Sequence, residues 1–331
     1  TKPVWRHGLP GTRHEFFSYT QPVVGKTSIL YRHKNIVYAR SILTGELRWR
    51  NDVGGRVTWQ NWQERQYPHE DLLVQDGLVF TPIYKVGPTL VALEETTGQL
   101  KWAYGPMVAA TPEQARMRFE TAPAGGPRTI YAGYVLDNIE VDTHIDTEYG
   151  VMAFESTTGR LRWRRPLCRL KPGLFTAGFA VRRRNRIRSF TSPPLYHQGT
   201  VYYNTNAGAI VAIDALSGRV KWVMRYPYYS LPYSVHDVTR QFGGTIRGYD
   251  PPRPHAPMFW YNQRPLLIGE RLFVLPVDAP FMYCLDRRTG RVNWTKKKGV
   301  HYKDCLLYTS PSPRDQRPNL VCRLLLEKRG G

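Results

Sequence analysis

One motif recurs five times along the 331 residues of this chain, and it constrains the fold more than any other feature. Each copy contains a short apolar strand, a turn that ends in glycine, and a tryptophan four residues after that glycine. The pairs are Gly45 and Trp49, Gly98 and Trp102, Gly159 and Trp163, Gly218 and Trp222, and Gly290 and Trp294. Alanine or cysteine stands six residues before each glycine, and threonine or serine directly before it. Five copies in one register indicate a repeat protein.

Each position of the motif has a physical reason. Glycine adopts a positive φ angle without steric cost, so we expect it to close a tight hairpin. The carboxylate found four residues before most of the glycines, as at Asp214, is expected to accept hydrogen bonds from the turn. The tryptophan should fill the space between neighbouring sheets and donate its N–H to a backbone carbonyl. The leucine or valine two residues earlier should share its strand face.

A second strand with its own turn precedes most copies, as at 76–80 and 198–203. No helical periodicity separates the strands, so each repeat consists of several short antiparallel strands. Radially arranged sheets are the architecture that accommodates such a unit. The sequence therefore predicts an all-β fold, a β-propeller of four-stranded antiparallel blades.

The repeat spacing predicts where the chain departs from a compact blade. Successive motif glycines are 53, 61, 59 and 72 residues apart, more than the roughly 40–50 residues of an economical blade. We place the surplus in loop insertions at 50–70, 104–126, 133–149, 168–192 and 224–262. About five blades are visible in a propeller domain at 1–304. Since seven blades at this spacing would need a longer chain, we expect a fragment that forms an incomplete ring.

The motif Ala-x-Asp-x-x-Thr/Ser-Gly-x-x-x-Trp, matched best at 212–222 and 284–294, resembles the repeat of bacterial pyrroloquinoline-quinone-like (PQQ-like) β-propellers. The resemblance covers about 36–300 and concerns the packing of the blades, so it implies the fold more than a function. An outer-membrane assembly lipoprotein group shares these repeats. That resemblance implies a periplasmic or outer-membrane-associated protein whose partner is a protein or another component of the cell envelope.

The same resemblance raises the question of a cofactor. Resemblance to the quinoprotein dehydrogenases of this fold would imply adjacent disulfide-forming cysteines over the quinone. It would also imply a calcium site of Glu, Asn and Asp, and an Asp base. This chain has no Cys-Cys pair, and outside the C-terminal tail it has only Cys168 and Cys284. We therefore expect no cofactor and favour a non-catalytic interaction or envelope-assembly scaffold. The alternative is a PQQ- and calcium-dependent alcohol or sugar dehydrogenase whose cofactor site is missing or incomplete here.

An acidic stretch supplies the metal-ligand candidates Asp142, Asp146 and Glu148. Its carboxylates alternate along the chain and so lie on one strand face, where clustered oxygens suit calcium. The spacing does not match an EF-hand loop, however. A hairpin with solvated polar side chains is the ordinary explanation of such a pattern.

The largest insertion, 224–262, is rich in aromatic and polar residues, which suits recognition of a ligand or partner above a propeller face. The candidates are Tyr228, Tyr229, Tyr233, His236, Asp237 and Trp260. A ligand-binding sensor is therefore a third reading, against the simpler one of a loop that packs its own rings on the blade beneath. No GxSxG nucleophile motif accompanies His236 and Asp237, so we assign no catalytic residue.

The net charge of +21 invites an anionic partner. Five arginines fall within 182–188, but no nucleic-acid-binding module surrounds them, and the remaining charge is spread through the repeats. A solvated blade edge is the favoured explanation, and no nucleic-acid partner is expected. No apolar run reaches the roughly 18 residues of a transmembrane helix.

The last residues, 305–331, differ in character from the repeats. Segments 305–315 and 320–328 read like translated sequencing adapter. We therefore expect a non-native, unstructured tail that packs on nothing.

Overall fold

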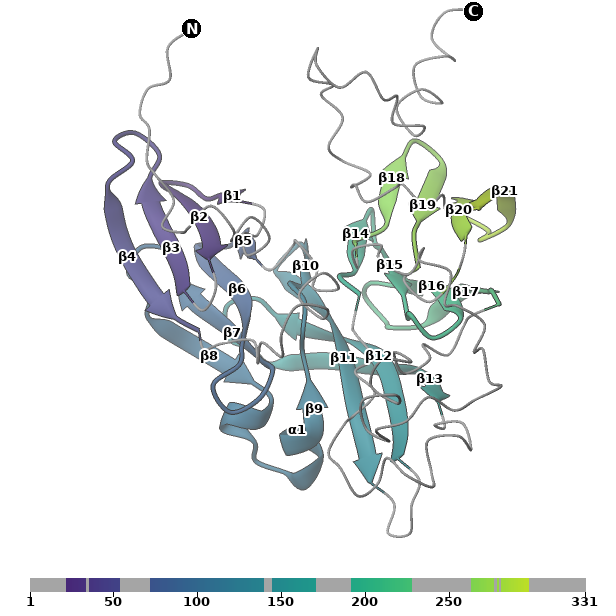
Figure 1. The fold of residues 1–331 in the computed structure, drawn as a ribbon, viewed down its shortest axis with the longest axis horizontal. Coiled ribbons are helices and arrows are strands. Elements are labelled where there is room, and N and C mark those ends of the chain that lie inside the picture. The colour runs from purple at the N-terminus through teal and green to yellow at the C-terminus, as the bar shows by residue number, and fades with distance from the viewer. Residues whose placement is uncertain are drawn as a thin grey trace, which may run out of the picture.

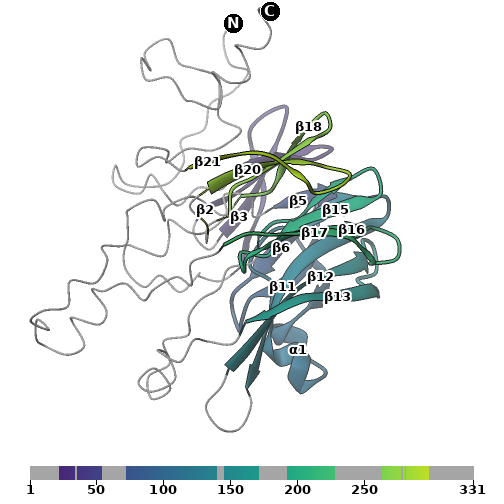
Figure 2. The ribbon, with the colours of Figure 1, turned by 90° about the vertical axis from the view of Figure 1, so that its right-hand side faces the viewer.

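The computed structural model describes residues 22–33, 36–53, 72–139, 145–170, 192–227, 263–276, 279 and 281–297. These residues form five antiparallel sheets that follow one another in chain order around an open arc (Figure 1). Figure 2 shows the third, fourth and fifth sheets stacked face to face. The predicted all-β propeller is confirmed, and each sheet is one blade.

Four of the blades have four strands each, paired in sequence order. The first contains β1 (Val23–Val24), β2 (Ser28–His33), β3 (Ile36–Ser41) and β4 (Leu47–Asp52). The second contains β5 (Leu73–Gln75), β6 (Leu78–Ile83), β7 (Thr89–Glu94) and β8 (Leu100–Tyr104). The fourth contains β14 (Leu195–His197), β15 (Thr200–Asn204), β16 (Ala209–Asp214) and β17 (Val220–Arg225). The fifth contains β18 (Leu266–Ile268), β19 (Arg271–Val274), β20 (Phe281–Asp286) and β21 (Val292–Lys297).

The third blade is larger. It contains β10 (Ala124–Gly126), β11 (Thr129–Ile139), β12 (Ile145–Glu155) and β13 (Leu161–Leu170). The connection from the second blade adds a 3-10 helix (Pro106–Val108), helix α1 (Pro112–Arg116) and β9 (Met117–Arg118), which pairs with β11. Thr111 caps α1 by accepting a hydrogen bond from the Gln114 N–H. Part of the predicted 104–126 insertion is thus folded onto the third blade.

The blades pack through apolar side chains that alternate along their strands, and the clusters bridge neighbouring sheets. Between the second and third blades, Phe80, Phe119 and Phe154 are fully buried in one such cluster. Equivalent clusters join the first to the second blade, the third to the fourth, and the fourth to the fifth. The core is therefore a series of apolar layers, one between each pair of neighbouring blades, as expected for a β-propeller repeat.

One expectation about the motif is wrong. The leucine or valine two residues before each tryptophan does not share its face, because a β-bulge separates the two positions in every blade. Ala39 pairs with Trp49, but Arg40 pairs with Leu47, so one residue is skipped and the alternation is reset. The aliphatic residues at this position are 41–50% exposed: Leu47, Leu100, Leu161, Val220 and Val292.

Candidate functional site

The antiparallel strand order sorts the connections onto two faces of the propeller. In each blade the first-to-second and third-to-fourth hairpins lie at one end, which we call the turn face. The second-to-third hairpin and the connection to the next blade lie at the other end, which we call the insertion face. All five predicted insertions begin and end at the insertion face, because four of them join successive blades and the fifth is the β11–β12 hairpin.

The turn face is built by the recurring glycine turns. All five motif glycines have φ angles of 69–72°, a conformation that strains any residue with a Cβ. The carboxylate of Asp286 accepts hydrogen bonds from the N–H groups of Arg288 and Thr289, and Asp214 accepts from Ser217. The hydroxyl of Thr289 also donates to Asp286, and these bonds hold the pKa of Asp286 below its usual range. The turns are therefore short and internally satisfied.

Four of the five motif tryptophans lock their blade to the glycine turn of the next blade. The indole N–H of Trp49 donates to the Glu95 carbonyl at 2.8 Å, and Trp102 donates to Ser156 at 2.9 Å. Trp163 and Trp222 make the same bond to Ala215 and Arg287, each at 3.0 Å. In every case the acceptor lies three residues before the motif glycine of the following blade.

The glycine of the receiving turn also makes room for the indole ring. A Cβ on Gly98 would lie 2.6 Å from the Trp49 ring, and one on Gly218 would lie 2.8 Å from Trp163. Glycine is thus required twice, for its φ angle and for the close approach of the ring. Trp49 is 8% exposed and the other four tryptophans are half-buried. These locks fix the relative position of successive blades and hence of the loops that they carry.

The long β11–β12 hairpin carries a buried charge cluster near its insertion-face end. The Glu148 side chain is 2% exposed, and its Oε1 accepts hydrogen bonds from Tyr134 at 2.8 Å and Arg164 at 2.7 Å. Its Oε2 accepts two hydrogen bonds from Arg169. Arg164 also pairs with Glu113 of α1, so the cluster ties the helix to the blade. The guanidinium groups of Arg164 and Arg169 therefore balance the negative charge of Glu148.

Burial raises the pKa of the Glu148 carboxyl, but the hydrogen bonds from Tyr134, Arg164 and Arg169 outweigh burial and hold the pKa below its usual range. A carboxyl with a depressed folded-state pKa contributes stability that is complete above its unfolded pKa. That contribution is lost as the pH falls through the lower folded-state value. The cluster therefore stabilises the third blade at neutral pH, and this stabilisation is lost in acid when Glu148 becomes protonated.

We expect Glu148→Gln to lower the free energy of unfolding by about 2–4 kcal/mol at pH 7, because the partly buried Arg164 then keeps only Glu113 as an anionic partner and Arg169 loses its ion pair. Urea unfolding between pH 7 and pH 3 measures this change. The difference between variant and wild type should shrink below pH 4.5, where the carboxyl of the unfolded chain becomes protonated, and should vanish once the pH falls below the lower folded-state pKa of Glu148. Glu46→Gln, at an exposed glutamate, should cost less than about 0.5 kcal/mol. A pH-independent difference would contradict the assignment.

The described residues include only some of the candidate metal-binding and ligand-binding residues that the sequence predicts. Within the described ranges, no group of three or more His, Cys, Asp or Glu side chains could hold a metal ion. Glu148 lies in the arginine cluster, whereas Asp142 and the Asp146 side chain lie outside the described residues. The loop candidates Tyr228, Tyr229, Tyr233, His236, Asp237 and Trp260 also lie outside them, as does the tail 305–331. Their proposed roles stay predictions.

The described residues do not supply the donor set of a quinone site. Cys168 lies in β13 of the third blade and Cys284 in β20 of the fifth, and no disulfide joins them. Cys284 is fully buried between apolar side chains, as expected for the small position of the motif. An adjacent disulfide and a carboxylate calcium cluster are therefore not found in the described ranges.

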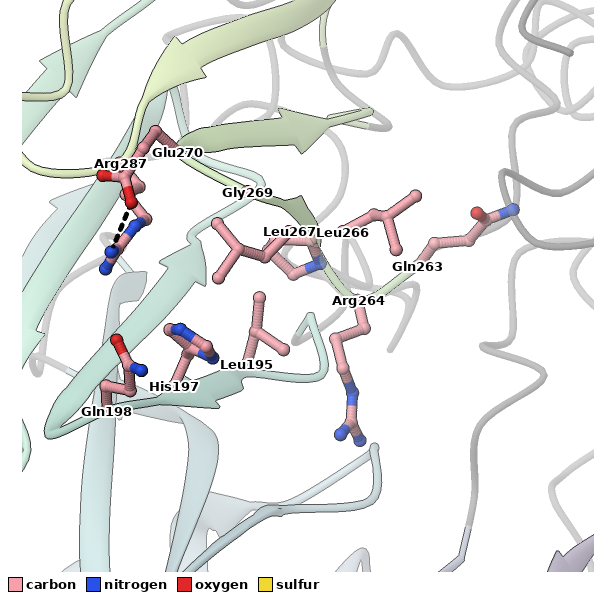
Figure 3. Close-up of a pocket in the computed structure, with 11 residues that line it drawn as sticks. Leu195, His197, Gln198, Gln263, Arg264, Leu266, Leu267, Gly269, Glu270 and Arg287 are labelled. Carbon is pink, nitrogen blue, oxygen red and sulfur yellow. Dashed lines mark hydrogen bonds and ion pairs between the residues drawn. The ribbon is translucent and has the colours of Figure 1, made fainter. Parts of the chain in front are cut away.

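A pocket that sequence reasoning missed lies between the inner strands β14 and β18. Its volume is about 470 Å³. Figure 3 shows leucine side chains between a polar end with Arg264 and another with Gln198, Glu270 and Arg287. No motif marks these residues, because they face each other from blades whose inner strands are about 70 residues apart in the sequence.

Repeated four-stranded blades locked by tryptophan define the class of PQQ-like β-propellers. A family model described as "Outer membrane protein assembly factor BamB" matches residues 2–296, and the chain belongs to this family. The family match ends before 305–331 and gives no support to the adapter interpretation of that tail. In the described part of the chain, no helix is long and apolar enough to cross a membrane.

Comparison with solved structures finds similar propellers at low identity. BamB from Moraxella catarrhalis is 14% identical with a TM-score of 0.47, and the match covers 82% of this chain and 58% of that one. Quinohemoprotein alcohol dehydrogenase ADHIIG from Pseudomonas putida HK5 is 17% identical with a TM-score of 0.48, covering 83% and 41%. The chain thus spans less than two thirds of either protein. A search of curated proteins found no match.

Proposed function

We propose that this chain is part of a non-catalytic scaffold of the cell envelope that binds a partner protein through its insertion face. The observation that carries the proposal is the asymmetry of the two faces. One end of every blade is closed by short turns, whereas every long insertion leaves from the other end. Long loops on a rigid support are where propellers and other repeat folds place recognition.

Family membership supports the envelope location and a role in assembly, since the family is described as an outer-membrane protein assembly factor. The tryptophan locks support a scaffold, because they hold the loops of successive blades at fixed spacing. A partner that touches several insertions at once would then meet a preformed surface, which lowers the entropy cost of binding. A cofactor-free role is part of this proposal. A quinoprotein dehydrogenase is not favoured by any contact among the described residues.

Crosslinking from the two faces tests the proposal. Val86 and Val108 lie on the insertion face and are 72% and 44% exposed, whereas Leu43 and Leu216 lie on the turn face and are 80% and 86% exposed. We expect a photo-crosslinking amino acid at Val86 or Val108, in a chain exported to the periplasm, to capture a defined envelope protein. The matched positions Leu43 and Leu216 should capture it at least about tenfold less. Equal capture from both faces, or capture from the turn face alone, would contradict the proposal.

A further inference from the structure

The junctions between blades differ at their inner, turn-face end, and the repeat allows them to be compared position by position. Between the first and second blades, the Glu95 carboxylate accepts a hydrogen bond from the Thr27 N–H at 3.2 Å. Between the second and third, Gln75 donates to the Gly126 carbonyl at 2.7 Å. Between the third and fourth, Tyr196 stacks on Tyr131 with ring centroids 5.4 Å apart. Each of these three junctions is closed by a side chain.

At the fourth junction the Arg287 side chain hydrogen-bonds the Tyr202 hydroxyl, but the inner-strand residues equivalent to Gln75 and Tyr196 make no hydrogen-bonding or ring-stacking bridge among the described residues. His197 ends its inner strand as Gln75 does, since each pairs with the first residue after its hairpin turn. Leu267 occupies the position of Tyr196, the middle residue of the inner strand. Both His197 and Leu267 line the pocket of about 470 Å³, so the space that is filled elsewhere is open here. The outer part of the junction is still locked, because Trp222 donates to Arg287.

The lining of the pocket is suited to an amphipathic anion. Leu195 and Leu267, which also pack in the apolar cluster between the fourth and fifth blades, form its apolar middle (Figure 3). The charged lining residues are two arginines, Arg264 and Arg287, against the single carboxylate of Glu270. Glu270 is already ion-paired with Arg287 at 2.7 Å and with Arg288 at 2.8 Å. The pocket therefore carries a net positive charge beside an apolar surface.

Arg264 is held at the insertion-face end of the pocket. One of its terminal nitrogens donates to the Pro123 carbonyl of the connection before β10, at 3.4 Å. The neighbouring Gln263 carbonyl accepts a hydrogen bond from the Ser192 hydroxyl. These contacts span three blades and fix the backbone from which the guanidinium projects. A planar guanidinium beside an apolar wall is well matched to a carboxylate carried on an apolar group.

We propose that this junction pocket binds a small carboxylate attached to an apolar group, with Arg264 contacting the carboxylate and Leu195 and Leu267 contacting the apolar group. The volume is sufficient for a small organic acid. The site lies on the inner strands, apart from the crosslinking positions on the insertion face. It does not depend on the scaffold role.

Calorimetric titration of the full chain with 4-phenylbutyrate tests the proposal, with 4-phenylbutanol as the neutral isostere. We expect the acid to bind and the alcohol to bind at least about tenfold more weakly, because the alcohol lacks the charge-assisted hydrogen bonds. Arg264→Gln should weaken binding of the acid about tenfold or more. Arg271→Gln, at an exposed arginine of β19 that does not line the pocket, should leave it unchanged.

A second variant separates loss of the site from loss of the fold. Leu267→Tyr places in the open junction the residue that closes the preceding one at Tyr196, so it should abolish binding without lowering the melting temperature. Absence of binding to the wild-type chain at 10 mM (roughly 100-fold above a 0.1 mM affinity) would overturn the proposal. Equal binding of acid and alcohol, or undiminished binding by Arg264→Gln, would also overturn it.

Discussion

Gly218→Ala is expected to lower the free energy of unfolding by about 3 kcal/mol, combining a strained backbone with overpacking. The φ angle of Gly218 is 69°, and a Cβ there would lie 2.8 Å from the Trp163 ring of the preceding blade. Since that ring is held by its bond to Ala215, it cannot retreat without losing a hydrogen bond. Urea unfolding followed by circular dichroism measures the change.

Gly199→Ala is the matched control for this prediction. Gly199 lies in the same blade with a φ of 74°, but nothing lies within 4 Å of a Cβ built on it. Its substitution should therefore cost only the backbone term, about 1–2 kcal/mol. The excess cost at Gly218 measures the contact between blades. Equal costs at the two glycines would show that the tryptophan makes no steric demand on the turn.

Trp49→Ala is expected to cost about 3–5 kcal/mol, the range for removing a large buried aromatic side chain. Trp49 is 8% exposed and is part of the apolar cluster between the first and second blades. Thermal and urea unfolding of the full chain measure the loss.

Trp49→Phe separates the ring from its hydrogen bond. It keeps an aromatic ring but removes the N–H that the Glu95 carbonyl accepts, so it should cost about 1–2 kcal/mol. A loss below about 1 kcal/mol for Trp49→Ala would contradict the role of the lock between blades.

Much of this fold is predictable because the repeat motif consists of residues that are close together in the sequence. The positive φ of the motif glycines, the hydrogen bonds to Asp214 and Asp286, and the tryptophan N–H bond to a backbone carbonyl all follow from one eleven-residue pattern. The exposure of Leu47 and its equivalents did not follow. A bulge moves one residue out of the pairing, and alternation along a strand cannot reveal where that occurs.

The functional features depend on contacts between distant segments, and this limits what the sequence predicts. Glu148 was put forward as a metal ligand, but its partners Arg164 and Arg169 come from the neighbouring strand and depend on the pairing of β12 with β13. The Arg264 contact with Pro123 joins residues 141 positions apart. The pocket lies where Leu267 occupies the inner-strand position that Tyr196 holds one blade earlier, where Tyr196 stacks on Tyr131. The sequence alone does not show that these two positions are equivalent, because their equivalence follows from the superposition of the blades.

The first four motif tryptophans each form one unit with the glycine turn of the next blade, and these units fix the face that carries the insertions. A double-mutant cycle of Trp49→Ala and Gly98→Ala tests this most directly. In the wild type, a Cβ on Gly98 would lie 2.6 Å from the Trp49 ring, whereas without the indole only the backbone strain remains. We predict a coupling energy of about 1–2 kcal/mol between the two sites. Additive costs, with a coupling near zero, would contradict the account.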